Sequence, residues 1–320
     1  MKRWDGNHRG IALLATLLAV SLMTLLVVEF STSAALGYRA AANQADELKA
    51  YYLARSGIQI GLAVLAKNSL VQSGAKYQYA SLDQAWAQPL VATPVDGGTV
   101  SMWIVDEDRK LDINKLFDEQ RREPDEQYAA IITRLLSNIG LSPALVPILI
   151  DWLDPDSIES DGGAEADYYL RLMPPYEPRN GQMPTIGDLR MLKGMDDLTF
   201  LRLSQYLTTM QTGAGPCCVN ANTASPEVLA ALLPELENDS DLVKQIVDIR
   251  SIRPFIQVTD LLNLPGISAA SEHLKRLVAV NSSYFLITAQ GDFAGARKRI
   301  YATFHLDPHG SAMLMNWHED

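Results

Sequence analysis

Cysteine is nearly absent from this chain, whose 320 residues contain only two. These two, Cys217 and Cys218, are neighbours, and a bond between neighbours would close a small, strained ring. The sequence therefore excludes the disulfide framework of small secreted domains. We expect two free or buried thiols, with a vicinal disulfide as the alternative in an oxidising compartment.

Positive charge is also scarce. The chain has 27 Lys and Arg residues against 38 Asp and Glu residues, which gives a net charge of −11. Nucleic-acid surfaces need clustered basic residues that displace counterions, so we expect no nucleic-acid partner. Residues 220–251 and 255–268 resemble helix-hairpin-helix units, which often grip phosphates in other proteins. The acidity favours a different interpretation of both segments, as compact helical packing units.

Familiar catalytic motifs are missing as well. The sequence has no G-x-S-x-G, no H-E-x-x-H and no phosphate-binding P-loop. Its histidines are scattered without metal-ligand spacing: His8, His273, His305, His309 and His318. We therefore expect a protein that is not an enzyme. The alternative is a membrane-anchored extracytoplasmic enzyme or binding protein that uses an acidic loop described below.

One long apolar run is present, from Ile11 to Val28, without any charge. As a helix, these 18 residues span roughly 27 Å, which is enough to cross the hydrocarbon core of a membrane. Basic residues precede the run (Lys2, Arg3 and Arg9), and no small-x-small cleavage pattern follows it. Because positive charge stays in the cytoplasm, the rest of the chain is expected on the far side of the membrane.

The helical pattern continues beyond the apolar run. No proline occurs from Glu29 to Lys67, and apolar residues recur at spacings of three and four: Tyr51, Ala54, Ile58, Leu62 and Leu65. This pattern predicts one helix over residues 11–67, with Gly57 and Gly61 allowing a close approach to a packed domain. The alternative is two helices with a joint near Gly37.

Strand patterns flank the middle of the chain. Thr99–Val105 reads as a strand, Asp106–Arg109 as a tight turn, and Lys110–Asn114 as a short returning strand. Near the other end, Tyr284–Gln290 and Lys298–Leu306 flank a Gly-containing turn, which predicts a hairpin.

Helical periodicity fills the region between these strands. It occurs in six segments: Tyr128–Asn138, Pro143–Leu153, Thr185–Leu192, Pro226–Leu233, Leu242–Arg250 and Ser268–Leu277. Helix starts are marked by Ser225 followed by Pro226, and by Thr259-Asp260. The order of strand, helical block and strand predicts an α+β fold with a large all-α insertion in an antiparallel sheet.

Residues 151–167 form a dense acidic stretch without Lys or Arg. The carboxylates are Asp151, Asp154, Asp156, Glu159, Asp161, Glu165 and Asp167. Pro155 and Gly162-Gly163 predict a loop, and such a loop suits a hard cation such as Ca²⁺, which takes six to eight oxygen ligands. Three of the carboxylates match EF-hand positions 1, 3 and 12, but Ile158 and Glu159 do not fit that motif. Composition alone favours an irregular calcium loop and a solvated acidic loop about equally.

Several segments together resemble the GspK-type minor pseudopilins of the type II secretion system. They are AYYLARSGIQIGLA (50–63), ILIDWLDPD (148–156), GGAEADYYLRLMPPYEPRNG (162–181), LRMLKGM (189–195) and VNANTASPEVLAAL (219–232). The Arg9-Gly10 pair before an apolar helix also resembles the cleavage site of a type IV prepilin-like leader. The resemblance covers nearly the whole chain.

The resemblance implies a type IV pilin-like fold. It divides the chain into a leader (1–10), a transmembrane and filament helix (11–67), a β domain (68–114 and 279–320) and an inserted α domain (115–278). It also implies calcium in the inserted domain, with Asp154, Asp156 and Glu165 as the best-matching ligands. Weaker candidate ligands are Asp151, Asp161 and Asn180.

Processing and assembly follow from the same resemblance. A prepilin peptidase would cut between Gly10 and Ile11, and the fifth residue after the cut is Ala15, where most pilin-like subunits have Glu. A subunit without that carboxylate is expected first in the pseudopilus, at its tip. The implied partners are GspI-, GspJ- and GspH-type minor pseudopilins, the inner membrane and secreted cargo, with the soluble part in the periplasm.

Overall fold

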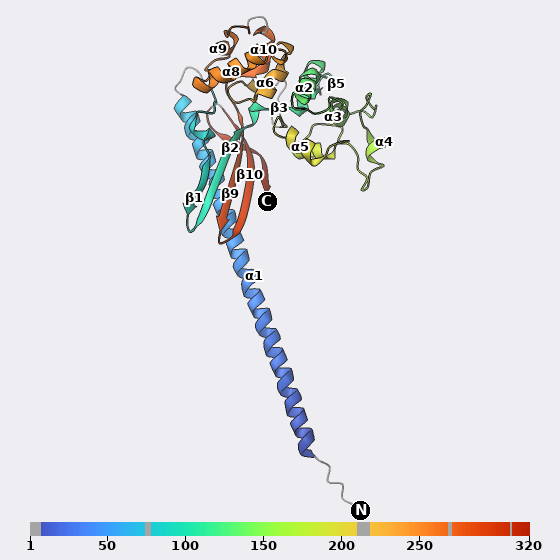
Figure 1. Ribbon diagram of the computed structural model, residues 1–320, viewed down its shortest axis with the longest axis vertical. Coiled ribbons are helices and arrows are strands. Elements are labelled where there is room, and N and C mark those ends of the chain that lie inside the picture. Colours follow the sequence, from blue (N-terminus) through green and yellow to red (C-terminus); the bar gives the residue numbers. More distant parts are fainter. Residues whose placement is uncertain (1–7, 74–77, 210–217, 268–270, 308) are drawn as a thin grey trace, which may run out of the picture.

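The computed structural model describes residues 8–73, 78–209, 218–267, 271–307 and 309–320. Helix α1 (His8–Ser73) is one continuous helix of 66 residues. This confirms the long predicted helix and excludes a break near Gly37. Figure 1 shows its lower part extending well beyond the rest of the molecule. Within the described residues, α1 is the one helix long and apolar enough to cross a membrane.

The upper part of α1 packs against a sheet. Ala54 and Ile58 are fully buried on the predicted apolar face. A Cβ added at Gly57 would lie 2.8 Å from the Cβ of Ala289, and one added at Gly291 would lie 2.1 Å from the carbonyl oxygen of Ala50. Because these glycines lack side chains, helix and sheet approach more closely than larger residues would permit.

The sheet has five antiparallel strands in the order β1-β2-β9-β10-β11. Their bounds are β1 Leu90–Val95, β2 Gly98–Asp106, β9 Tyr284–Phe293, β10 Ala296–Leu306 and β11 Ala312–Glu319. The predicted hairpin is confirmed as β9–β10, and both turn residues, Ala294 and Gly295, have positive φ as a type I′ turn requires. The two edge strands, β1 and β11, were missed from the sequence.

The predicted return strand at 110–114 was wrong. Residues Leu111–Asp112 (β3) pair in parallel with Leu207–Thr208 (β6), inside the insertion. The cause lies at Asp106, whose carboxylate accepts a hydrogen bond from the backbone of Asp108 and caps a 3₁₀ turn, η2 (Glu107–Arg109). The chain therefore leaves the sheet at this point, and β2 pairs with β1 and β9.

The insertion between β2 and β9 is mainly helical, as predicted. Its helices are α2 Glu126–Asn138, α3 Leu145–Leu153, α4 Ala166–Tyr169, α5 Asp197–Leu203, α6 Pro226–Leu232, α7 Pro234–Glu237, α8 Ser240–Ile252, α9 Val258–Leu262 and α10 Ser271–Leu277. Shorter 3₁₀ turns and two-residue strands connect them: η3 Ile113–Leu116, η4 Ile186–Met191, β4 Phe117–Asp118, β5 Glu123–Pro124, β7 Val219–Asn220 and β8 Val278–Ala279. One further 3₁₀ turn, η1 Ala85–Ala87, lies outside the insertion, between α1 and β1. Segment 185–192 is thus 3₁₀, whereas Ser225 caps α6 as expected.

Two hydrophobic cores hold the molecule together. One lies between α1 and the sheet and includes Ile58, Ile287 and Ile300. The other lies inside the insertion and includes Leu135 and Leu149. The insertion therefore has its own packed interior, and the chain crosses between the two parts near Asp106 and Tyr284.

Candidate functional site

The acidic stretch begins where α3 ends. Helix α3 is almost entirely apolar until Asp151, and it stops at Leu153 because Asp154 adopts an extended conformation before Pro155. The following loop returns to α4 with Glu165 in the N-cap position. This path brings the start of the loop, at Asp154, and its end, at Glu165, close to Asp151 in the last turn of α3.

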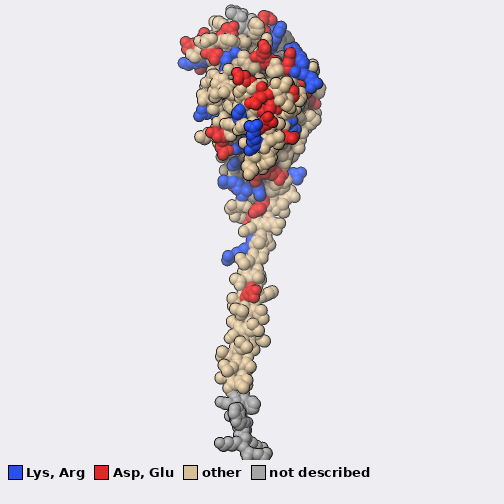
Figure 2. Space-filling model, turned by 90° about the vertical axis from the view of Figure 1, so that its right-hand side faces the viewer, with Lys and Arg blue, Asp and Glu red and all other residues tan. Residues whose placement is uncertain are grey.

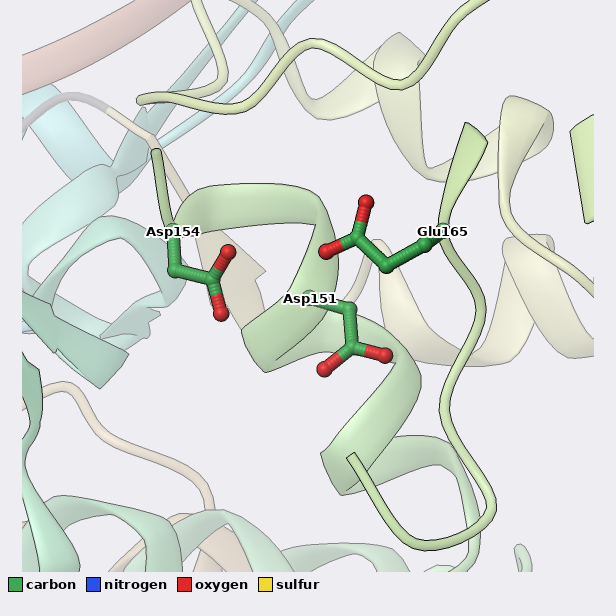
Figure 3. Close-up of side chains that lie close together, drawn as sticks. All are labelled: Asp151, Asp154 and Glu165. Carbon is green, nitrogen blue, oxygen red and sulfur yellow. The ribbon is translucent and has the colours of Figure 1, made fainter. Parts of the chain in front are cut away.

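Three carboxylates meet there. One oxygen from each of Asp151, Asp154 and Glu165 lies within 4.8 Å of the others. Figure 3 shows the three side chains converging from α3, from its end and from the segment opposite. All three residues are buried, with exposed fractions of 0, 7 and 3 %.

The electrostatics of this cluster are unfavourable without a cation. Burial, reinforced by the neighbouring carboxylates, raises the pKa of Asp154 to about 6 and that of Glu165 to about 7. One oxygen of Asp154 and both oxygens of Glu165 are buried without a hydrogen-bond partner. Buried polar atoms are rarely left without a partner, so these oxygens fit the ligand set of a hard cation.

Asp151 has an additional part in this arrangement. Its carboxylate accepts hydrogen bonds from the backbone of Ala164 (2.8 Å) and of Ser160 (3.2 Å). A Cβ at Gly163 would lie only 1.8 Å from its Oδ2 atom, so the loop approaches the carboxylate too closely for any side chain there. Asp151 therefore holds the loop in place as well as facing the other two carboxylates.

The other candidate ligands are arranged differently. Asp156 and Asp161 are exposed, and one Asp156 oxygen accepts a hydrogen bond from the backbone of Ile158. Asn180 donates from Nδ2 to the carbonyl of Asp156 (2.8 Å), while its Oδ1 is buried and without a partner. Asn180 therefore offers a further oxygen beside the loop.

Lys193 is a residue of this site that sequence reasoning missed. Its Nζ donates to the carbonyl of Gly163 (2.7 Å) and lies 5.1 Å from the ring centre of Tyr168. The ammonium group thus contacts both the backbone of the loop and the ring of Tyr168 in α4. The segment that contains Lys193, LRMLKGM, was already among the family-like segments, but nothing in its pattern indicates this contact.

The processing positions lie at the other end of the molecule. Gly10, Ile11 and Ala15 are all in α1 and exposed. No atom lies within 4 Å of a Cβ built on Gly10. Residues 1–7 of the predicted leader, and Cys217 of the cysteine pair, lie outside the described residues, whereas Cys218 is exposed and its Sγ donates to the carbonyl of Arg276 at 3.7 Å.

Comparison with known proteins supplies the context of these features. Family models for "Type II secretion system (T2SS), protein K" match residues 109–212 and 219–281. Type II secretion system protein K of Pseudomonas aeruginosa is 28 % identical over 97 % of this chain and 92 % of its own length. The protein of the same name from Klebsiella pneumoniae is 30 % identical over 91 % of each chain.

A solved structure has the same fold. It is described as the GspK-GspI-GspJ complex from the enterotoxigenic Escherichia coli type 2 secretion system. The matching chain superposes with a TM-score of 0.72 and 18 % identity, covering 88 % of this chain and 99 % of its own length. The helix, the sheet and the helical insertion therefore occur together in another protein.

Proposed function

This chain belongs to the protein K family of the type II secretion system, and we propose that it is the minor pseudopilin that starts the pseudopilus and occupies its tip. In this role it supports protein export across the outer membrane as a structural subunit without catalytic turnover. Its single helix anchors it in the inner membrane before assembly, with the sheet and the insertion in the periplasm.

The observation that supports this proposal is that α1 has two different parts: the upper part packs against the sheet, and the lower part is apolar and exposed. Every residue from 10 to 41 in the lower part of the helix is exposed, and large apolar side chains there are more than half exposed, as at Leu13, Leu18 and Val27. Figure 2 shows this part almost free of charged side chains, whereas the body carries both signs. An apolar helix of this kind needs lipid or neighbouring apolar helices around it.

The exposed apolar part of α1 also indicates which partners the protein binds. We propose that α1 packs beside the helices of GspI- and GspJ-type subunits, the partners named for the structurally similar chain, and of a GspH-type subunit. Ala15 removes the carboxylate that other pilin-like subunits bring into the membrane, where a charge is costly unless it is paired. A first subunit has no earlier subunit with which to form that pair. Secreted cargo would meet the assembly at the insertion.

The test uses processing by a prepilin peptidase between Gly10 and Ile11. Gly10→Leu should leave the protein folded, because nothing lies within 4 Å of the added Cβ, but should block removal of the leader and abolish secretion. Gly37→Leu is a matched control, since the same helix also has nothing within 4 Å at Gly37. Mass spectrometry of the two variants measures processing. The proposal would be excluded if the leader of Gly10→Leu were removed as in the wild type and secretion were unchanged.

We also propose that the cluster of Asp151, Asp154 and Glu165 binds Ca²⁺, with the Oδ1 of Asn180 as a further ligand. The partnerless buried oxygens support a cation, and an all-oxygen donor set favours a hard one. In this role the ion would join the end of α3 to the start of α4 and stabilise the insertion. The alternative, an enzyme that uses these carboxylates, predicts turnover that disappears in Asp154→Ala while folding survives.

The calcium proposal is tested by chelation of the full-length protein in detergent. A ligand that binds the native state alone stabilises it by about 2.7 kcal/mol at a hundredfold excess over Kd. EDTA should therefore lower the melting temperature, and added Ca²⁺ should restore it. If elemental analysis detected no calcium in the protein and EDTA left the melting temperature unchanged, the site would be excluded.

A further inference from the structure

A second buried acidic group lies where the chain leaves and re-enters the sheet. Asp106, Glu107 and Asp108 are consecutive, and their exposed fractions are 1, 6 and 8 %. Glu107 forms an ion pair with Lys110 at 2.8 Å. Asp106 ends β2, and Asp108 contacts the first residue of β9, so both aspartates lie at the joint between the sheet and the helical insertion.

Asp106 connects distant segments through neutral donors. Its Oδ2 accepts hydrogen bonds from Thr223 Oγ1 (2.6 Å), Ser282 Oγ (2.6 Å) and Asn220 Nδ2 (3.0 Å). Asn220 Nδ2 also donates to the carbonyl of Ala80, in the segment that follows α1. One carboxylate thus ties together the end of β2, the segment after β7 and the segment before β9.

Asp108 holds the point of return. Its Oδ2 accepts hydrogen bonds from the backbone of Ser283 (2.5 Å) and of Tyr284 (3.1 Å). Burial and the neighbouring charge of Asp106 nevertheless raise the pKa of Asp108 to about 7. Burial also raises the pKa of Asp106. The two carboxyl groups are therefore not both ionised readily in the closed joint.

Other titratable groups surround Asp108. Glu107 and Asp106 flank it in the same segment. The Cys218 thiol is near enough that Asp108 raises its pKa, after burial, while Lys115 of η3 lowers it. From the sheet side, the His305 ring packs on the Tyr284 ring, with centroids 4.8 Å apart.

We propose that Asp108, backed by Asp106, is a proton-dependent latch between the sheet and the insertion, closed when the carboxyl is protonated and loosened when it ionises. The direction follows from linkage. An opened joint exposes Asp108 to water, where its pKa returns towards the ordinary 3.8. The closed joint therefore holds a proton that the open joint releases, and the closed form loses stability as the pH rises from about 4 to 7. Above 7 both forms are ionised and the stability levels off.

Hydrogen exchange on the full-length protein in detergent tests the latch. Exchange rates corrected for the intrinsic effect of pH should show opening of the Ser283 and Tyr284 amides that grows by up to about tenfold per pH unit between about pH 5 and 7. Amides in the middle of β10, such as that of Ile300, serve as the reference for global unfolding. If the opening of the Ser283 and Tyr284 amides in the wild type does not depend on pH more steeply than that of the β10 amides, the proposal is overturned. This measurement needs no variant.

Three variants assign the slope to a residue. Asp108→Asn keeps an acceptor for both backbone donors but has no titrating proton, so its joint should stay protected at pH 7.5 and show no slope. Glu107→Gln and His305→Gln should retain the slope, since each changes a neighbouring titratable side chain and leaves both backbone donors to Asp108 in place. Persistence of the slope in Asp108→Asn, or its loss in His305→Gln, overturns the proposal.

Discussion

The molecule buries two groups of carboxylates, at the joint and in the acidic loop, and surrounds them in opposite ways. At the joint, backbone amides, hydroxyls and a side-chain amide donate to the aspartates. In the loop, one oxygen of Asp154 and both oxygens of Glu165 are buried without a hydrogen-bond partner. Burial and neighbouring carboxylates raise the pKa values of Asp108, Asp154 and Glu165 alike, yet of these two groups it is the loop that has buried oxygens without a partner.

This difference shows that the hydrogen-bond partners of a buried carboxylate indicate whether it needs a metal ion. Hydrogen-bond donors, together with a bound proton, compensate the buried carboxyl groups of the joint and fix their positions, so the joint needs no metal ion. A group of carboxylates that faces itself needs either protons or a cation. The following changes should separate the two cases, because only the loop should respond to calcium.

The largest effect is expected for Asp106→Ala. This change removes a shared buried acceptor from three side-chain donors and one backbone donor. Breaking such a buried charged network costs about 3 to 5 kcal/mol. Thermal or urea unfolding should show the same loss with calcium and with EDTA. A loss that depended on calcium would mean that the two clusters are coupled.

The next effect is a change of sign at Asp154→Asn. In calcium the variant should be less stable than the wild type, because it weakens a ligand and lowers affinity by about tenfold or more, equivalent to about 1.4 kcal/mol. In EDTA at neutral pH it should be at least as stable, because it removes one of several repelling charges. Calcium titrations followed by melting temperature measure both. Destabilisation of equal size in both conditions would argue for a purely structural loop.

Much of the fold follows from local patterns, but the joint does not. Helix α1, the β9–β10 hairpin and most helices have periodicity or turn chemistry within a few residues. The missed β1–β2 hairpin also had a signal, since Asp96-Gly97 is a strong two-residue turn and both residues have positive φ. By contrast, Asp106 read as part of a tight turn because its partners Thr223 and Ser282 lie 117 and 176 residues away. No spacing within the sequence encodes such contacts.

Part of the candidate site could likewise be predicted from local sequence features. Composition and resemblance indicated Asp154 and Glu165, and the structure places their carboxylates together. Asp151 ranked as a weaker candidate because it matches the motif less well than the other two, yet it is the most buried of the three. Its contact with the backbone of Ala164 depends on how the loop folds back across Gly163, and that path is set by packing beyond the loop.

A smaller effect is expected for Gly163→Ala. The new Cβ would lie 1.8 Å from Asp151 Oδ2, so the carboxylate or the loop must move, at a cost of about 1 to 3 kcal/mol. The displacement should weaken calcium binding although no ligand is removed. Gly181→Ala is the matched control, because its nearest contact is 4.0 Å away. Isothermal calorimetry should show reduced affinity in the first variant and wild-type affinity in the second. Equal affinities would mean that Asp151 does not position the site.

The smallest effect is expected for Asp161→Asn, which makes the same chemical change as Asp154→Asn in the same loop. Asp161 is exposed, so its charge is already solvated, and the substitution should change stability by less than about 0.5 kcal/mol in calcium or EDTA. Calcium affinity should fall only through weaker long-range attraction, which added salt screens. If Asp161→Asn instead lowered affinity as much as Asp154→Asn at high salt, the loop would have to close over the ion, and the buried trio would be only part of the ligand set. The pair of isosteric substitutions therefore distinguishes a preformed site from one completed by an exposed carboxylate.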